Sequence, residues 1–284
     1  MNGFAQYALT DLSRANRIDP SDPLPLYYRG CLRYSTNPQA ADADFTAALK
    51  IDQSNAHILA ARGVLREATG REKLAKADYA AAIRVKPHLV PTQVNLGFCY
   101  LRQRPPDCCG ALKCADAALR FEGTNARAWV CKGEALRRMN SMDEAQRAFA
   151  KALHLDATCA MAFFCRGFML AEMDENRPAL YDLLSFLRCS DADQNPHLGR
   201  LKGQAYLLLE QHEEACTEFR AELDRVSKPG LAATADSAET YRLLGESFRG
   251  QGSLVEAKQH FDVAVSKAPK DVRKRTRAPA SWSP

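Results

Sequence analysis

The chain has 284 residues, of which 46% are hydrophobic and 26% charged, a composition typical of a folded protein rather than a disordered one. Its longest apolar runs, such as YLLLE, are too short to cross a membrane. Residues 265–284 carry six basic residues and one acid, an excess that equals the whole net charge of +5. The rest of the chain is balanced. Because phosphate binding needs clustered positive charge, we expect no nucleic-acid-binding surface.

The ten cysteines are interpreted as free thiols. The opening residues MNGFAQYALTDLSR lack the basic and then apolar order of a secretory signal, which favours a reducing compartment. We therefore expect a cytoplasmic protein, with a nuclear or ciliary location as the alternatives.

The dominant feature of the sequence is an internal repeat with a period close to 34 residues. Each unit has a glycine, then an alanine twelve residues later, and usually a bulky residue four residues after the alanine. The four clearest sets are Gly63, Ala75 and Tyr79; Gly133, Ala145 and Phe149; Gly167, Ala179 and Leu183; and Gly245, Ala257 and Phe261.

In chain order, residues 1–22 fit only the second half of a unit, and seven full units occupy 23–269. Position 1 of these units lies near residues 23, 56, 90, 126, 160, 196 and 238. Apolar residues at three- and four-residue steps predict two amphipathic helices in each unit. No strand pattern competes, so the predicted fold class is all-α.

Two stretches depart from the period. Extra residues near 226–237, including Pro229 and Gly230, predict an inserted loop. Residues 270–284 predict a basic, disordered tail. Solenoids normally have polar terminal caps, and neither end shows one. The sequence therefore predicts either a piece or variant of a longer array, or end-to-end self-association with another copy.

The units resemble the tetratricopeptide repeat family from about residue 4 to Pro269. The family's Trp-x-x-Leu-Gly-x-x-Tyr opening is best preserved over 129–136 and 241–248. The resemblance implies an α-solenoid of stacked helix-turn-helix repeats, wound as a right-handed superhelix, whose first helices line a concave groove. It also implies a non-catalytic scaffold with protein or peptide partners.

The resemblance places most partner contacts at positions 2, 5, 9, 12 and 13 of each unit. The candidate protein-binding residues are Tyr27, Val94, Phe98, Val130, Phe164, Phe168, Arg200 and Arg242. Position 9 reads Cys31, Val64, Phe98, Glu134, Phe168, Gln204 and Glu246. The apolar middle predicts that a partner segment anchors large side chains there. The alternative, weighed equally, is that these rings pack between helices or against the predicted loop.

Two specialised functions of the family are not expected. The carboxylate clamp that captures the acidic C-terminal tail of a chaperone would fall on Ala60, Val64, Asn95, Arg127 and Cys131. These residues meet two of the five roles in part, so this partner is disfavoured. The asparagine ladder of members that select substrates for sugar transfer would occupy position 6, where this chain has one asparagine.

The sequence predicts no enzyme activity, no cofactor and no metal site. The sequence has no phosphate-binding glycine loop and no nucleophile elbow, and its six histidines are scattered over different units. Cys108 and Cys109 lie about 120° and 140° from Cys114 around the expected helix, so the three thiols do not share one face.

The unit that begins near residue 90 is irregular. Pro105 and Pro106 are expected to stiffen its turn, and Asp107 to cap the helix that follows. Ala115 stands where other units have an aromatic residue. The sequence therefore predicts loose packing at this joint and a stabilising effect of Ala115→Phe.

A protein-interaction scaffold is thus the function that the sequence favours. The alternatives are a regulatory or substrate-selecting arm of a larger enzyme and a structural subunit of a ciliary or trafficking complex.

Overall fold

The computed structural model describes residues 2–192, 198–226 and 235–267. Regular structure in these residues consists of fifteen helices, without a strand among them, which confirms the all-α prediction. The chain divides into two compact units, Met1–Ala145 and Gln146–Pro284, and each is described by itself. We call them unit 1 and unit 2. Their boundary lies within helix α9.

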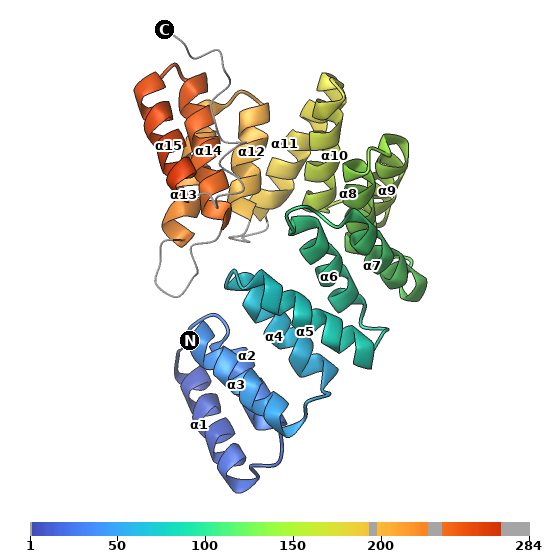
Figure 1. The fold of residues 1–284 in the computed structure, drawn as a ribbon, viewed down its shortest axis with the longest axis vertical. Helices are drawn as coiled ribbons and strands as arrows, with labels where there is room; N and C mark the ends of the chain where they lie inside the picture. The colour runs from blue at the N-terminus through green and yellow to red at the C-terminus, as the bar shows by residue number, and fades with distance from the viewer. Residues whose placement is uncertain (1, 193–197, 227–234, 268–284) are drawn as a thin grey trace. The chain divides into compact units, whose positions relative to one another are not determined.

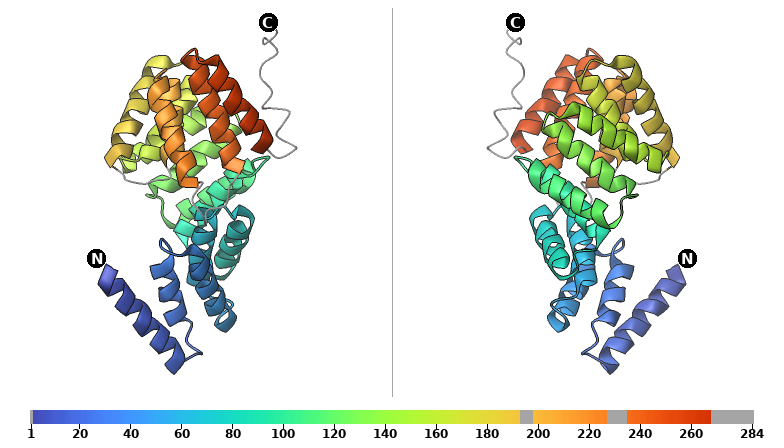
Figure 2. Two further views of the ribbon diagram at one scale, coloured as in Figure 1. Left: turned by 90° about the vertical axis from the view of Figure 1, so that its left-hand side faces the viewer. Right: turned by 90° about the vertical axis from the view of Figure 1, so that its right-hand side faces the viewer.

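Unit 1 is built from helices that each contact the next one along the chain, and Figures 1 and 2 show the two helices of each pair side by side and antiparallel. A single helix, α1, precedes three pairs. The helices are α1 (Asn2–Ile18), α2 (Leu24–Arg33), α3 (Pro38–Ile51), α4 (Ala56–Ala68), α5 (Glu72–Val85), α6 (Val90–Arg102), α7 (Cys108–Phe121) and α8 (Ala126–Arg138), followed by the start of α9 (Met142–Leu155).

Unit 2 repeats the same arrangement after the end of α9. Its helices are α10 (Ala160–Glu172), α11 (Asn176–Ala192), α12 (Gly199–Leu208), α13 (His212–Val226), α14 (Ala235–Gly250) and α15 (Leu254–Lys267). Here too each helix of a pair contacts its partner, and α11 and α13 contact the first helix of the next pair. Most of the predicted loop (residues 227–234) and the whole predicted tail (270–284) lie outside the described residues.

Local sequence signals begin several of these helices. The side chains of Asn37, Asn55, Asp107 and Asn125 each accept a hydrogen bond from the backbone N–H three residues ahead. Such a side chain satisfies one of the four backbone donors that a helix leaves unpaired at its N-terminus. The prediction that Asp107 caps the second helix of its pair is confirmed by the 2.8 Å bond from the Gly110 amide.

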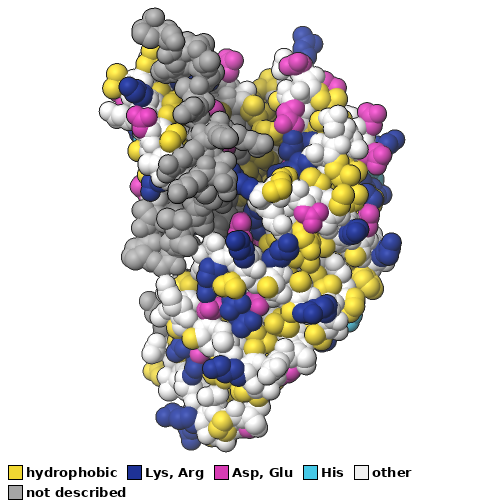
Figure 3. All heavy atoms as spheres, viewed as in Figure 1, with side chains coloured by type: hydrophobic (Ala, Val, Ile, Leu, Met, Phe, Trp, Pro, Cys, Tyr) yellow, Lys and Arg dark blue, Asp and Glu magenta, His cyan; other side chains and the backbone are white. Residues whose placement is uncertain are grey.

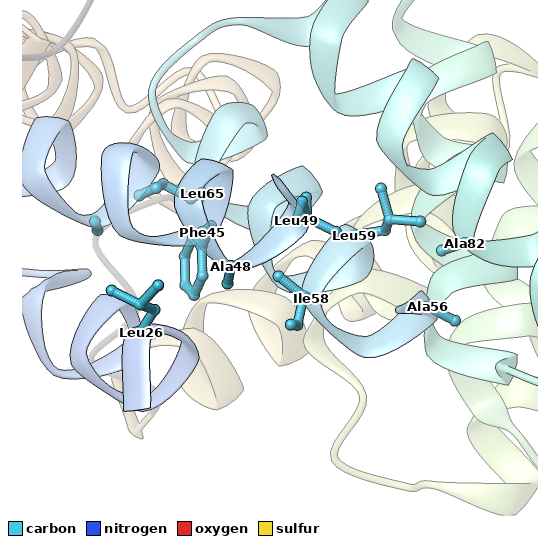
Figure 4. Packing of buried hydrophobic residues seen from close by; sticks show 10 residues of the cluster. Leu26, Phe45, Ala48, Leu49, Ala56, Ile58, Leu59, Leu65 and Ala82 are labelled. Carbon is cyan, nitrogen blue, oxygen red and sulfur yellow. The ribbon is translucent and has the colours of Figure 1, made fainter. Parts of the chain in front are cut away.

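The repeated glycine makes room for the repeated aromatic ring of the same pair. A β-carbon on Gly30 would lie 2.7 Å from the ring of Phe45, and one on Gly63 would lie 2.6 Å from the ring of Tyr79. Both rings are almost completely buried. Figure 4 shows Phe45 beside Leu26 and Ala48 in a cluster that joins α2, α3 and α4. The glycine is therefore needed for close packing, as the repeat indicates.

The pair α6–α7 solves the same packing problem differently, and the expected looseness at Ala115 is wrong. Ala115 is fully buried, and a β-carbon on Gly97 would lie 2.6 Å from Sγ of Cys131. Cys131 belongs to α8, which contacts α6 directly. The first helix of the next pair thus fills the space that an aromatic ring fills elsewhere, so Ala115→Phe is expected to crowd this joint.

Candidate functional site

The structure separates the predicted position 5 residues into buried and accessible ones. Val94 and Val130 are 1% and 0% exposed, and Phe164 is 8% exposed, whereas Tyr27 is half-buried. Val94 packs with Val90, Ala118 and Ala128 in one apolar cluster. Position 5 lies at the edge between the helix contact and the open face, so its exposure depends on the neighbouring helices. The buried residues therefore do not enter the proposal below.

The two phenylalanines of α10 divide in the same way. The ring centroid of Phe164 lies 5.1 Å from that of Phe186 on α11, and Phe186 is completely buried. Phe164 is thus part of the contact between the two helices. Phe168, 6.1 Å from Phe164, is half-buried and stays at the edge of the same face. The alternative of packing between helices describes Phe164 well, whereas Phe168 remains a candidate contact residue.

The predicted arginines of unit 2 are both half-buried. Arg242 is held on its own helix by Glu239, at 2.7 Å, and by Glu246. Its charge is therefore balanced by two carboxylates before any partner arrives. Arg200 lies in the first turn of α12, near the start of that helix.

Unit 1 keeps an apolar surface on three successive first helices. Tyr28 is 53% exposed, Val64 is 38% exposed, Cys31 is exposed and Phe98 is half-buried. Tyr27 joins them, with its ring centroid 5.1 Å from that of Tyr28. We call Tyr27, Tyr28, Cys31, Val64 and Phe98 the first-helix surface. Figure 3 shows that apolar side chains also gather on the visible face over the α5–α7 region.

Polar groups close the α8 side of this surface. Asn95, the single asparagine at position 6, accepts a 3.3 Å hydrogen bond from Arg127. These two residues are the ones that partly met the carboxylate clamp pattern. Because Arg127 already donates its hydrogen bond to Asn95, the structure adds no support for a carboxylate clamp at these positions.

A set of arginine–aspartate pairs, which the sequence analysis missed, fixes the two helices of a pair against each other. Arg29 binds Asp44 at 2.6 Å, and Arg62 binds Asp78 at 2.8 Å. The two carboxylates are each 4% exposed, so the arginines compensate charges that burial would otherwise make costly. The signal was present in the sequence. The arginine directly precedes the repeated glycine, and the aspartate directly precedes the aromatic residue.

Further ion pairs connect neighbouring pairs of helices in unit 1. Asp42 on α3 binds Arg66 on α4 at 3.1 Å and Arg71 at 2.8 Å. Burial alone would raise the pKa of Asp42, but the two guanidinium groups outweigh it and hold that pKa below its ordinary value. Figure 3 shows interleaved basic and acidic atoms over the region of α4 and α5.

A second link of this kind centres on Glu67 of α4. Its carboxylate accepts a 2.6 Å hydrogen bond from the Tyr79 hydroxyl and a 2.6 Å bond from Arg102 on α6. Burial and the neighbouring carboxylate raise the pKa of Tyr79, so its hydroxyl stays protonated and remains a donor. Because these arginines are paired, this end of the first-helix surface has little spare positive charge for an acidic ligand.

The cysteines do not gather into a metal-binding group in the described part of the chain. No group of three His, Cys, Asp or Glu side chains converges there as a metal site would require. Burial raises the pKa of Cys114 to about 11 and that of Cys131 to about 12. Both thiols are therefore protonated at neutral pH and serve in packing. None of the described helices combines the length and hydropathy that crossing a bilayer requires.

A comparison with models of known protein families identifies one of the repeats. Residues 126–159, which contain α8 and α9, match the family model for the tetratricopeptide repeat. Residues 126–159 are a tetratricopeptide repeat. The match falls on the unit in which the family's opening pattern begins at Trp129. No curated protein sequence matches the chain.

Several solved structures share the fold, among them two of tetratricopeptide repeat proteins. YrrB, a repeat protein with an unusual peptide-binding site, is 23% identical with a TM-score of 0.52, over 63% of this chain and 91% of YrrB. A repeat protein from Parabacteroides merdae is 16% identical with a TM-score of 0.59, over 90% and 97% of the two chains. The Cut9–Hcn1 hetero-tetramer of the APC/C gives 16% identity and a TM-score of 0.60, over 84% of this chain and 46% of that one.

Proposed function

We propose that this chain is a non-catalytic tetratricopeptide repeat scaffold that binds a segment of a partner protein on the first-helix surface of unit 1. The observation that carries the proposal is the run of apolar side chains left accessible on α2, α4 and α6, where Tyr28, Val64 and Phe98 lie. Such side chains gain free energy when a partner removes them from water.

The ion pairs beside this surface support the same proposal. Asp44, Asp78, Asp42 and Glu67 hold the helices in place through arginines that are already paired, so the surface is rigid before a partner binds. A pre-organised surface avoids part of the entropic cost of association. The partner would be chosen mainly by apolar side chains, because the nearby charges are internally balanced. Among the structural neighbours, YrrB is described as having a peptide-binding site.

The test is site-specific crosslinking in cells, with a photoreactive residue in place of Val64 or, separately, Leu74. Val64 lies on the first-helix surface, and Leu74 is similarly exposed, 48%, but lies on the second helix α5. A partner segment on the first-helix surface should crosslink from position 64 and not from position 74. Mass spectrometry would identify the crosslinked protein and the contacting segment.

Binding of that protein should then fall about tenfold or more with Val64→Asp and stay unchanged with Leu74→Asp. Circular dichroism melting curves should be alike for both variants, because both side chains are exposed. Equal crosslinking from the two positions, or equal binding by the two variants, would overturn the proposal.

A further inference from the structure

A second exposed apolar patch lies on α11, a second helix of unit 2 and thus separate from the first-helix surface. Leu180, Tyr181 and Leu184 are 48%, 64% and 50% exposed. They lie beside the buried face of α11 that Leu183, Phe186 and Leu187 form, and those three residues are at most 7% exposed. Three large apolar side chains within two turns of one helix form a patch that folding does not bury.

The repeat itself does not require apolar residues at these places. The same three positions on the other second helices are mostly charged, polar or small. In chain order they are Asp42, Ala43 and Thr46; Lys76, Ala77 and Ala80; Leu112, Lys113 and Asp116; Gln146, Arg147 and Ala150; Cys216, Thr217 and Arg220; and Lys258, Gln259 and Asp262. The patch on α11 therefore needs an explanation other than the stacking of repeats.

Two exposed arginines mark the ends of the patch. Arg177, Tyr181, Leu184 and Arg188 follow one another at steps of four, three and four residues, which places them on one straight stripe. The stripe is about 16 Å long at the helical rise per residue. Neither arginine has an ion-pair partner among the described residues. The contact of Arg188 there is a 3.4 Å hydrogen bond to the Ser185 hydroxyl.

We propose that this α11 stripe docks an amphipathic helix of a partner protein, with acidic residues about three turns apart on either side of its apolar residues. A helix laid along α11 would cover Tyr181 and Leu184 and place one carboxylate against each arginine. Helices that pack at a small crossing angle stay in contact over such a length. An arginine forms a directed, charge-assisted pair with a carboxylate, which would set the register of the partner.

The charges argue against a second copy of this chain as the occupant. If two α11 stripes packed antiparallel, Arg177 of each would face Arg188 of the other, and parallel packing would set each arginine against itself. Both arrangements bring like charges together. An anionic membrane is also disfavoured, because the neighbouring second helix α13 carries the exposed acids Glu213, Glu214 and Asp224.

The experiment measures binding of designed helical peptides to the full chain by fluorescence anisotropy. One peptide of about 18 residues carries a leucine stripe with a glutamate at each end, eleven residues apart, and its counterpart has lysines in place of the glutamates. The glutamate peptide should bind at least about tenfold more tightly than the lysine peptide. Tyr181→Glu combined with Leu184→Glu should weaken that binding about tenfold or more.

Charge reversal gives the sharper test. Arg177→Glu combined with Arg188→Glu should reverse the preference, so that the lysine peptide binds more tightly. Helix α5 supplies a matched control, because Lys73 and Arg84 occupy the same repeat positions but flank Ala77 and Ala80. Lys73→Glu combined with Arg84→Glu should leave both affinities unchanged. Equal affinity for the two peptides, or a preference that reversal does not change, would refute the proposal.

Two other measurements would refute it in favour of another occupant. Light scattering that shows a dimer abolished by Leu184→Glu would identify a second copy as the occupant. Stripe-dependent binding to vesicles of anionic phospholipid, without binding of the glutamate peptide, would identify a membrane.

Discussion

At the residue scale, the turns inside the helix pairs show a strain that could be removed. The residue at position 15 of five units has a positive φ, with Gly70 at 73°, Asn140 at 63°, Asp174 at 60°, Glu210 at 58° and Gly252 at 79°. In each turn the next amide donates back to the carbonyl five residues earlier, which satisfies a free group at the helix end. Glycine takes this conformation without the steric cost that a β-carbon adds, so Glu210 is the least suited of the five.

Glu210→Gly should raise the free energy of unfolding by about 0.5–1 kcal/mol, because it removes the β-carbon from a left-handed residue. Urea denaturation followed by circular dichroism would measure the change. Gly252→Ala is the matched reverse change, since a β-carbon there would meet nothing within 4 Å. It should lower stability by about 1 kcal/mol through backbone conformation alone. A destabilising Glu210→Gly would contradict this account.

At the scale of the elements, each joint between helices depends on one small residue and the group that lies over it. In most pairs this group is a ring from the same pair, as with Gly245 and Phe261. In the pair α6–α7 it is Cys131 from α8. The group that packs over the small residue can therefore come from the same pair of helices or from the next pair. The repeat pattern in the sequence reveals a packing group that comes from the same pair of helices, but not one that comes from the next pair.

The contact between Gly97 and Cys131 can be tested with a double-mutant cycle. Gly97→Ala should cost about 1–3 kcal/mol of unfolding free energy, because its β-carbon would clash with the Cys131 sulfur. In the background of Cys131→Ala the same change should cost much less, since the sulfur is gone. Equal costs in the two backgrounds would show that the sulfur does not set the packing.

Ala115→Phe is expected to lower the melting temperature, which is the opposite of what the sequence alone suggests. Ala115 is fully buried in a cluster with Ala111, Cys131 and Ala135, so a ring has no free space to enter. Ala115→Ser, which adds one atom, should have a smaller effect. Differential scanning calorimetry of the two variants would decide, and a raised melting temperature for the phenylalanine variant would restore the earlier expectation.

At the scale of the whole molecule, stability rests on paired carboxylates as well as on apolar packing. Glu134 is 9% exposed and binds Arg137 and Arg138 on its own helix, at 2.9 and 2.6 Å. Burial would raise its pKa, but the two guanidinium groups outweigh burial and bring the pKa below its ordinary value of 4.5. The pKa of Asp42 is likewise held below its ordinary value of 3.8 by Arg71 and Arg66.

A group whose pKa is lower in the folded state than in the unfolded state stabilises the protein at the pH values at which the group is ionised. The contribution of Glu134 should be complete above pH 4.5, its ordinary pKa, and should disappear as the pH falls through the lower folded value. Urea denaturation between pH 7 and pH 3 should show this loss. Glu134→Gln should lower stability at pH 7 and flatten the acid dependence. An unchanged pH profile in that variant would contradict the assignment.

The sequence by itself determined the fold class and the helix-turn-helix repeat, because both depend on apolar periodicity and on local caps such as Asn55 and Asp107. It also located the first helices on which partner contacts are expected. The expectation of end-to-end association stays a prediction. On α1, the first helix of unit 1, Phe4 and Tyr7 are 89% and 75% exposed.

Only the tertiary structure decided which of the expected contact residues are accessible. Val94 and Val130 are buried and Tyr27 is not, although all three occupy position 5, because exposure depends on the size of side chains on neighbouring helices. The size of a side chain on a neighbouring helix also explains the joint at Gly97, where Cys131 fills the space that an aromatic ring fills in other pairs. The exposure of Leu180, Tyr181 and Leu184 on α11 also came from the structure, because the repeat marks Leu183 as the packing residue but does not say whether its apolar neighbours are covered.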